Sequence, residues 1–189
     1  VEENNGVYTP KYSVGNLKGA VFEVYAAEDI TTLDGTVRYE QGTLVDTVTT
    51  DDDGVAKSKE LYLGKYTVIE KTAPSGFVHN STKYDVELTY AGQNISVTST
   101  DLSVYNERQK VSVSLKKIMA EDKTFGIGNN GEITSVRFGI YAGDDIKASN
   151  GDVIPKDALI TFVNCDKDGN ISFDCDLPVG FKWYVKEIA

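Results

Sequence analysis

The chain has 189 residues, 40% of them hydrophobic, which is enough apolar side chain for one or two packed cores. Its formal net charge of −10 makes nucleic acids and anionic membrane surfaces unfavourable partners. It contains no apolar run long enough to form a membrane-spanning helix, so we expect no membrane contact by this part of the protein.

Short segments in which apolar and polar residues alternate follow one another along the chain. These strand-like segments are residues 20–25, 86–90, 95–98, 102–105 and 111–115. Turn dipeptides such as Asp53-Gly54 and Asp168-Gly169 separate them, and no window shows a convincing helical face. Short strands about every 8–12 residues with Gly/Asp turns predict an all-β sandwich.

One run of residues occurs twice. Phe22–Ile30 (FEVYAAEDI) returns as Phe138–Ile146 (FGIYAGDDI), an offset of 116 residues. The correspondence continues from Asp34-Gly35 to Asn150-Gly151. A period this long is typical of tandem whole domains and too long for a solenoid repeat.

The two copies differ in how far they extend. The first continues beyond Glu70 to a strand-like segment that ends at Asn106, whereas only two residues follow Glu187 at the matching place in the second. A polar run then separates the two patterns. We therefore expect two tandem β-sandwich domains, residues 1–107 and residues 108–189, with the second lacking its last strands.

Three polar residues lie on rows that otherwise carry apolar, core-facing side chains. Glu70, Asn106 and Lys117 each extend such a row by strand parity. A buried charge without a partner is costly, so these groups would have to pair, become neutral or react. Alternatively, each lies at a strand end, where parity no longer implies burial.

Three segments carry a resemblance to a known family. Leu17–Tyr25, Thr50–Gly54 and Leu63–Phe77 together resemble the collagen-adhesin B-type (Cna B, SpaA-like) domains of Gram-positive surface proteins and pilins. The resemblance covers residues 11–106 and returns over residues 111–189, up to the final Glu. It implies two tandem prealbumin-like, inverse-immunoglobulin β-sandwiches in an extracellular, cell wall-anchored surface protein.

The resemblance also implies a covalent cross-link. Many members of this family join a Lys on the first strand to an Asn or Asp on the last strand, assisted by a Glu. Carried onto this sequence, Lys11 is the candidate nucleophile, Asn106 the acceptor amide and Glu70 the assisting acid. Lys18 is the competing nucleophile, although it lies beside Gly19 and is expected to point to solvent. The first strand, Thr9-Pro-Lys-Tyr12, departs from the family's usual alternating run.

In the second domain, Lys117 and Glu187 fit the family's amine and acid. The Asn that would complete the set falls in the missing portion, so we expect no isopeptide bond there. The chemistry requires a desolvated amine and a protonated acid, both of which burial favours. Each bond forms once, as self-maturation, so the chain is not expected to be an enzyme.

Other patterns do not support a metal, a cofactor or a catalytic triad. Asp166–Asn170 begins like a calcium loop, but its twelfth position is Leu177 where a bidentate glutamate is needed. Asp51–Asp53 is interpreted as a solvated turn. The only histidine, His79, has no second His or Cys with metal-site spacing.

The leading hypothesis is a structural or adhesive module of a bacterial surface protein, of stalk or pilin type. Its expected partners are neighbouring domains of the same protein and a host extracellular matrix protein or glycan. The alternative is a domain that binds a carbohydrate or host protein. Such a domain would expose an aromatic patch or a pocket with convergent polar groups.

Overall fold

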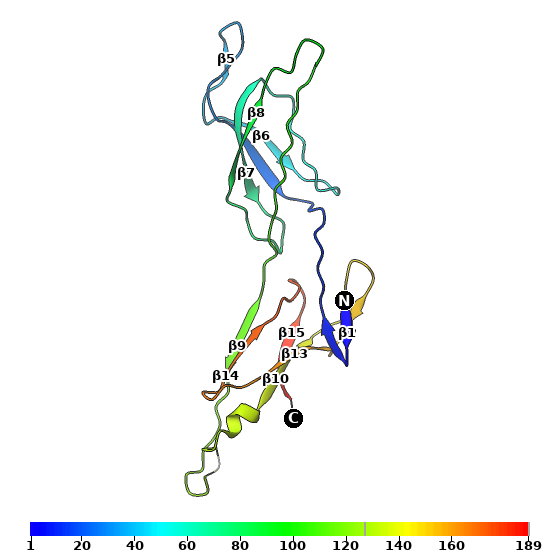
Figure 1. The fold of residues 1–189 in the computed structure, drawn as a ribbon, viewed down its shortest axis with the longest axis vertical. Helices are drawn as coiled ribbons and strands as arrows, with labels where there is room; N and C mark the ends of the chain where they lie inside the picture. Colours follow the sequence, from blue (N-terminus) through cyan, green and yellow to red (C-terminus); the bar gives the residue numbers. More distant parts are fainter. Residues whose placement is uncertain (127, 189) are drawn as a thin grey trace. The chain divides into compact units, whose positions relative to one another are not determined.

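The computed structural model describes residues 1–126 and 128–188, and these confirm the predicted all-β fold (Figure 1). The one helix among them is the short 3₁₀ turn η1 (Glu132–Ser135). The described chain divides into two units. The first unit is residues 14–109, and the second unit combines residues 1–13 with residues 110–188.

The first unit is built on one antiparallel sheet with the strand order β6-β3-β7-β8. Its strands are β3 (Val21–Ala26), β6 (Leu44–Thr49), β7 (Gly64–Thr72) and β8 (Lys83–Leu88). A two-stranded hairpin, β4 (Ile30–Thr31) with β5 (Val37–Tyr39), is attached. The buried core of this unit consists of Val24, Ala26, Ile30, Val45 and Tyr66.

The second unit is built on a five-stranded sheet with the order β1-β2-β13-β10-β15. Its strands are β1 (Glu2–Asn4), β2 (Val7–Thr9), β10 (Arg137–Ala142), β13 (Leu159–Asn164) and β15 (Trp183–Ile188). Two smaller pairs complete the unit: β9 (Ser112–Lys116) with β14 (Asn170–Asp174), and β11 (Ile146–Lys147) with β12 (Val153–Ile154).

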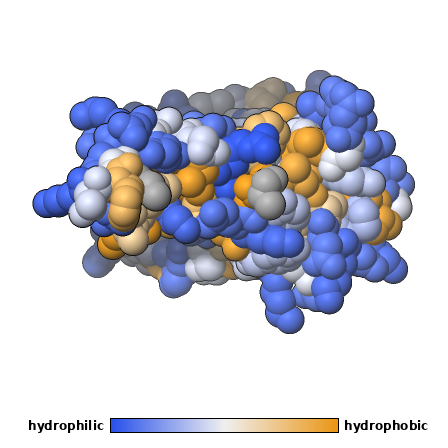
Figure 2. Space-filling model, turned by 90° about the horizontal axis from the view of Figure 1, so that it is seen from below, coloured by the Kyte–Doolittle hydropathy of each residue, from blue (hydrophilic) through white to orange (hydrophobic). Residues whose placement is uncertain are grey.

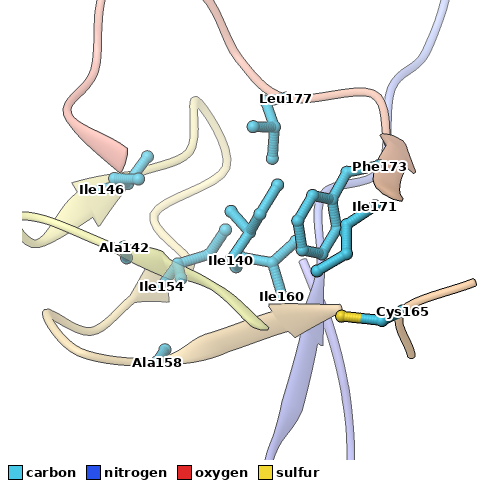
Figure 3. Close-up of a cluster of buried hydrophobic side chains, with 10 residues drawn as sticks. All are labelled: Ile140, Ala142, Ile146, Ile154, Ala158, Ile160, Cys165, Ile171, Phe173 and Leu177. Atoms are coloured by element: carbon cyan, nitrogen blue, oxygen red, sulfur yellow. The ribbon is translucent and has the colours of Figure 1, made fainter. Parts of the chain in front are cut away.

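The core of the second unit lies between the five-stranded sheet and the β9–β14 pair. Ile171 and Phe173 of β14 are 2% and 0% exposed and point toward Ile140 and Ile160 of the five-stranded sheet (Figure 3). This packing is the sandwich expected from alternating strands, in which the inward-facing residues of two sheets meet. Both cysteines, Cys165 and Cys175, carry free thiols.

The sequence repeat is also a structural repeat. Phe22 lies opposite Glu70 in the pairing of β3 with β7, and Phe138 lies opposite Glu187 in the pairing of β10 with β15. The register between β3 and β6 shifts just before Tyr25, and the register between β10 and β13 shifts at the matching place, just before Tyr141. The repeat therefore extends to strand register and to the position of a bulge.

The N-terminal segment lies where the sequence did not predict it. Residues 1–13 were expected to begin the first domain, but they belong to the second unit, where β2 pairs in parallel with β13 and Val7 lies opposite Leu159. The boundary after Gln109 is two residues beyond the predicted one. The strands predicted at 95–98 and 102–105 are wrong, because the described residues there form no strand. A strand needs a neighbour for its backbone hydrogen bonds, and the segment predicted to begin that domain pairs with β13 instead.

Candidate functional site

Glu70 and Asn106 form a buried, directly hydrogen-bonded pair in the first unit. Glu70 lies on β7 and is 3% exposed, and Asn106 is 8% exposed. The Asn106 side-chain nitrogen, Nδ2, donates to both carboxylate oxygens of Glu70, at 2.8 and 2.9 Å. It also donates to the Val78 carbonyl oxygen at 3.1 Å. The structure thus brings together the predicted assisting acid and the predicted acceptor amide.

A loop that follows β7 holds this pair in place. The Asn80 backbone N–H donates to Glu70 Oε2 at 2.6 Å, and the Asn80 side chain donates to the Tyr105 carbonyl oxygen at 3.0 Å. His79 Nε2 lies 2.7 Å from the Glu70 carbonyl oxygen. Sequence reasoning missed these supporting residues, because their backbone contacts leave no pattern in the sequence. Two amide groups, the Asn106 side chain and the Asn80 backbone N–H, donate to the Glu70 carboxylate.

The structure does not bring Lys11 to this pair. The Lys11 side chain belongs to the second unit and is 58% exposed, and its Nζ lies 2.6 Å from Glu2 Oε2. That hydrogen bond and the charge of Lys11 lower the pKa of Glu2 from its ordinary value. The competing Lys18 is 66% exposed, and its Nζ lies 2.6 Å from Asp52 Oδ1. Both candidate nucleophiles are therefore solvated and paired with carboxylates elsewhere.

Lys117 and Glu187, in contrast, do meet. The Nζ of Lys117, just after β9, donates to Glu187 Oε2 on β15 at 2.8 Å. The two side chains are 31% and 48% exposed, so solvent reaches this ion pair. Within the part of the chain that the structure describes, β15 pairs with β10 alone. The predicted amine and acid of the second domain are thus adjacent.

The aspartate turns use their carboxylates internally. Asp166 Oδ1 accepts the backbone N–H groups of Asp168 and Asn170, at 2.9 and 2.8 Å, and these bonds lower the pKa of Asp166. Asp51 Oδ1 accepts from Asp53 and Val55 in the same way, both at 3.0 Å. No group of three or more potential ligands that could hold a metal ion occurs in residues 1–126 and 128–188. Nor do these residues include a helix long and apolar enough to cross a membrane.

Comparison with known proteins identifies the class of this fold. The model of the SpaA prealbumin-like fold domain matches residues 9–103, which is half of the chain. The chain therefore belongs to the SpaA prealbumin-like family, found in Gram-positive pilin-type surface proteins, and the resemblance seen in the sequence is confirmed.

Similar proteins include one surface protein known by sequence and two solved structures. The trypsin-resistant surface T6 protein of Streptococcus pyogenes serotype M6 is 27% identical over 153 residues, covering 81% of this chain and 23% of that protein. The Bacillus anthracis TIE protein superposes with a TM-score of 0.55 at 24% identity, covering 92% of this chain and 26% of that one. A streptococcal ancillary pilin has 21% identity and a TM-score of 0.37, covering 92% and 49%. The chain thus spans about a quarter of the first two proteins.

Proposed function

We propose that this chain is a load-bearing module of an extracellular, cell wall-anchored surface protein of stalk or pilin type. The observation that carries the proposal is the buried Glu70–Asn106 pair within a SpaA-like fold. A structural module of this kind has neighbouring domains of the same protein as its first partners.

We further propose that the first unit matures by forming an isopeptide bond between Lys11 and Asn106. The neutral Lys11 amine attacks Asn106 Cγ, the new C–N bond forms, and the Cγ–Nδ2 bond breaks to release ammonia. Glu70 contacts the nitrogen that must leave, so its carboxyl group can accept a proton from the attacking amine and deliver one to the departing ammonia. Burial of the acid removes competing water and supports this transfer.

The stabilisation expected from the bond comes from chain entropy. A link between Lys11 and Asn106 would close a loop of about 95 residues, which by analogy with disulfides contributes about 4–5 kcal/mol. That is a large fraction of the stability of an ordinary domain. A module under tension outside the cell would gain both thermodynamic stability and resistance to extension.

Intact-mass spectrometry of the purified chain tests this chemistry. Loss of ammonia lowers the mass by about 17 Da per bond, so the wild type should show one such loss. Asn106→Ala and Glu70→Ala should restore the unreacted mass, and Lys18→Arg is the matched control that should leave the loss intact. Peptide mapping must then find Lys11 joined to Asn106. A wild-type mass equal to that of the unmodified sequence would refute the bond.

In the second unit, the same chemistry has an amine and an acid but no assigned acceptor. Lys117 and Glu187 would therefore remain an unreacted ion pair in this chain. The expected mass loss is consequently one ammonia and not two. A second loss, mapped to Lys117, would contradict this part of the proposal.

A ligand-binding role is the second candidate, favoured by an aromatic surface on the second unit. Tyr141 and Tyr184 stack with ring centroids 5.3 Å apart, and Phe162 is 48% exposed with the Arg137 guanidinium 5.8 Å from its ring centroid. In the view of Figure 2, several separate groups of apolar residues lie among hydrophilic ones. Arrays of glycans and matrix proteins test this role, with Phe162→Ala expected to abolish any binding that uses this surface.

A further inference from the structure

The N-terminal segment, defined here as residues 7–13, is held on the second unit by a small set of contacts. Its strand β2 adds to the edge of β13, with Val7 opposite Leu159. The Tyr8 side chain packs against the core of the second unit. The Tyr12 hydroxyl donates to the Asp176 carbonyl oxygen at 2.9 Å, and Lys11 pairs with Glu2. In this position the Lys11 amine is solvated.

An alignment of Lys11 with Lys117, with a shorter connection in the first copy, gives the same segment a place in the first unit. Lys117 directly follows β9, the strand that covers β14 in the second unit. When the sequence is aligned so that Lys11 matches Lys117, β2 (Val7–Thr9) matches the middle of β9. In this alignment residues 12–16 correspond to the longer connection formed by residues 118–132. The match to the family model also begins at residue 9, so it assigns part of this segment to the first repeat.

The chain geometry can return Lys11 to the reactive pair. Phe22 lies opposite Glu70 on β7. Lys11 lies five residues before Asn16, and Phe22 lies five residues after Leu17. If the chain reversed direction at Asn16-Leu17, Lys11 would therefore lie at the same height along the strands as Phe22. Lys117 lies beside Glu187, which is opposite Phe138, so the second unit already contains the matching arrangement.

The first unit leaves exposed the surface that such a strand would cover. In the second unit, β9 pairs with the segment after the aspartate turn, where Ile171 is 2% exposed. After the equivalent turn in the first unit, residues 55–60 form no strand, and Ala56, which the matching turn hydrogen bonds place in register with Ile171, is only half-buried. Next to the acceptor amide, Leu102 is 39% and Tyr105 64% exposed. These are apolar side chains of the kind a neighbouring strand buries.

We propose that residues 7–13 exchange between two positions that exclude each other. In one they extend β13 and withhold Lys11 from Asn106, as in the structure. In the other they form the first strand of the first unit, and Lys11 reacts. Docking on β13 thus delays the isopeptide bond, and the bond makes the release from β13 permanent. This inference rests on the proposed Lys11–Asn106 chemistry and adds a control step to it.

A pair of cysteines makes the two positions distinguishable by mass. Val7→Cys and Leu159→Cys occupy directly paired positions, at a separation that a disulfide can span. Cys165→Ala and Cys175→Ala remove the native thiols, and the chain with these two substitutions alone is the matched control. The protein is produced in an oxidising compartment, and its intact mass is followed before and after a reductant is added.

The expected spectrum contains molecules lighter by about 2 Da, locked by a disulfide, and molecules lighter by about 17 Da, but none lighter by about 19 Da. The reductant should convert the first population into the second. Molecules lighter by about 19 Da would carry the disulfide and the isopeptide bond together. They would overturn the proposal that the two positions exclude each other, but not the proposed isopeptide bond. Absence of the locked species, or its failure to react after reduction, would overturn the docking or the exchange. Absence of a 17 Da loss in the matched control would refute the proposed bond itself.

Discussion

Replacing Lys11 with Arg separates the covalent contribution to stability from the non-covalent one. A guanidinium stays protonated and cannot attack Asn106, so this variant loses only the cross-link, about 4–5 kcal/mol. Asn106→Ala also removes the two hydrogen bonds to a carboxylate that is 3% exposed. Hydrogen bonds to charged groups contribute about 1.5–3 kcal/mol each, and the Asn80 N–H remains as a donor. We therefore expect Asn106→Ala to cost about 2–4 kcal/mol more than Lys11→Arg.

Urea unfolding measures this difference, and the chain contains a convenient probe. Trp183, the only tryptophan, lies in the second unit, so its fluorescence follows that unit while circular dichroism follows both. With an m-value of about 1.5 kcal/mol/M, the urea concentration at the midpoint of unfolding of the first unit should be about 3 M lower in Lys11→Arg than in the wild type. Lys18→Arg should unfold like the wild type. If Lys11→Arg also unfolds at the wild-type urea concentration, the cross-link does not stabilise the first unit and the reasoning fails.

Three further predictions concern the second unit and its hold on the N-terminal segment. Gly169→Ala should destabilise the second unit by about 1–3 kcal/mol, because Gly169 has φ +79° and an added Cβ would overlap the Lys117 carbonyl oxygen. Gly151→Ala, with φ +92° but open space, should cost less in the same Trp183 fluorescence assay. Asp166 has a lowered pKa in the folded state, so its stabilisation is present above the unfolded value of about 3.9 and is lost as the pH falls through the folded value. Asp166→Asn should therefore unfold at a lower urea concentration than the wild type at pH 7, and this difference should shrink below about pH 4. A difference that is independent of pH would contradict this prediction. Tyr12→Phe loses the hydrogen bond to Asp176 and should speed formation of the isopeptide about two- to tenfold in time-resolved mass spectra, whereas an unchanged rate would argue against docking as the brake.

Local patterns predicted much of this fold. Alternation identified β3 and β9 within a residue or two, and the repeated run around Phe22 and Phe138 predicted two similar units. Strand parity also predicted that Glu70 extends a core-facing row, and Glu70 is buried on β7. Asn106 is buried too, although the strand predicted before it does not form. These successes share a cause, because period-two burial is encoded within a few residues of chain.

The position of Lys11 could not be predicted in the same way. The segment around it has two candidate sheet edges, one beside β13 and one in the first unit, and strand alternation is satisfied by either. Which edge is used depends on non-local hydrogen bonds such as that from Tyr12 to Asp176, which no sequence window contains. The predicted strands at 95–98 and 102–105 were wrong for a related reason, because a strand needs a neighbouring strand for its backbone hydrogen bonds and alternation within a short window does not supply one.

The residues proposed for isopeptide chemistry lie in different electrostatic environments in the two units. Glu70 is buried beside an amide, whereas Glu187 is half-exposed beside an ammonium group. Solvent reaches the Lys117–Glu187 ion pair, so contact between this amine and this acid does not supply the desolvated site that the proposed reaction requires. For Lys11, the buried environment of Glu70 would favour the neutral amine only after the lysine leaves Glu2 and enters the first unit. Burial of the acid and arrival of the lysine strand are thus separate requirements of the proposed reaction, and Glu70 meets the first of them.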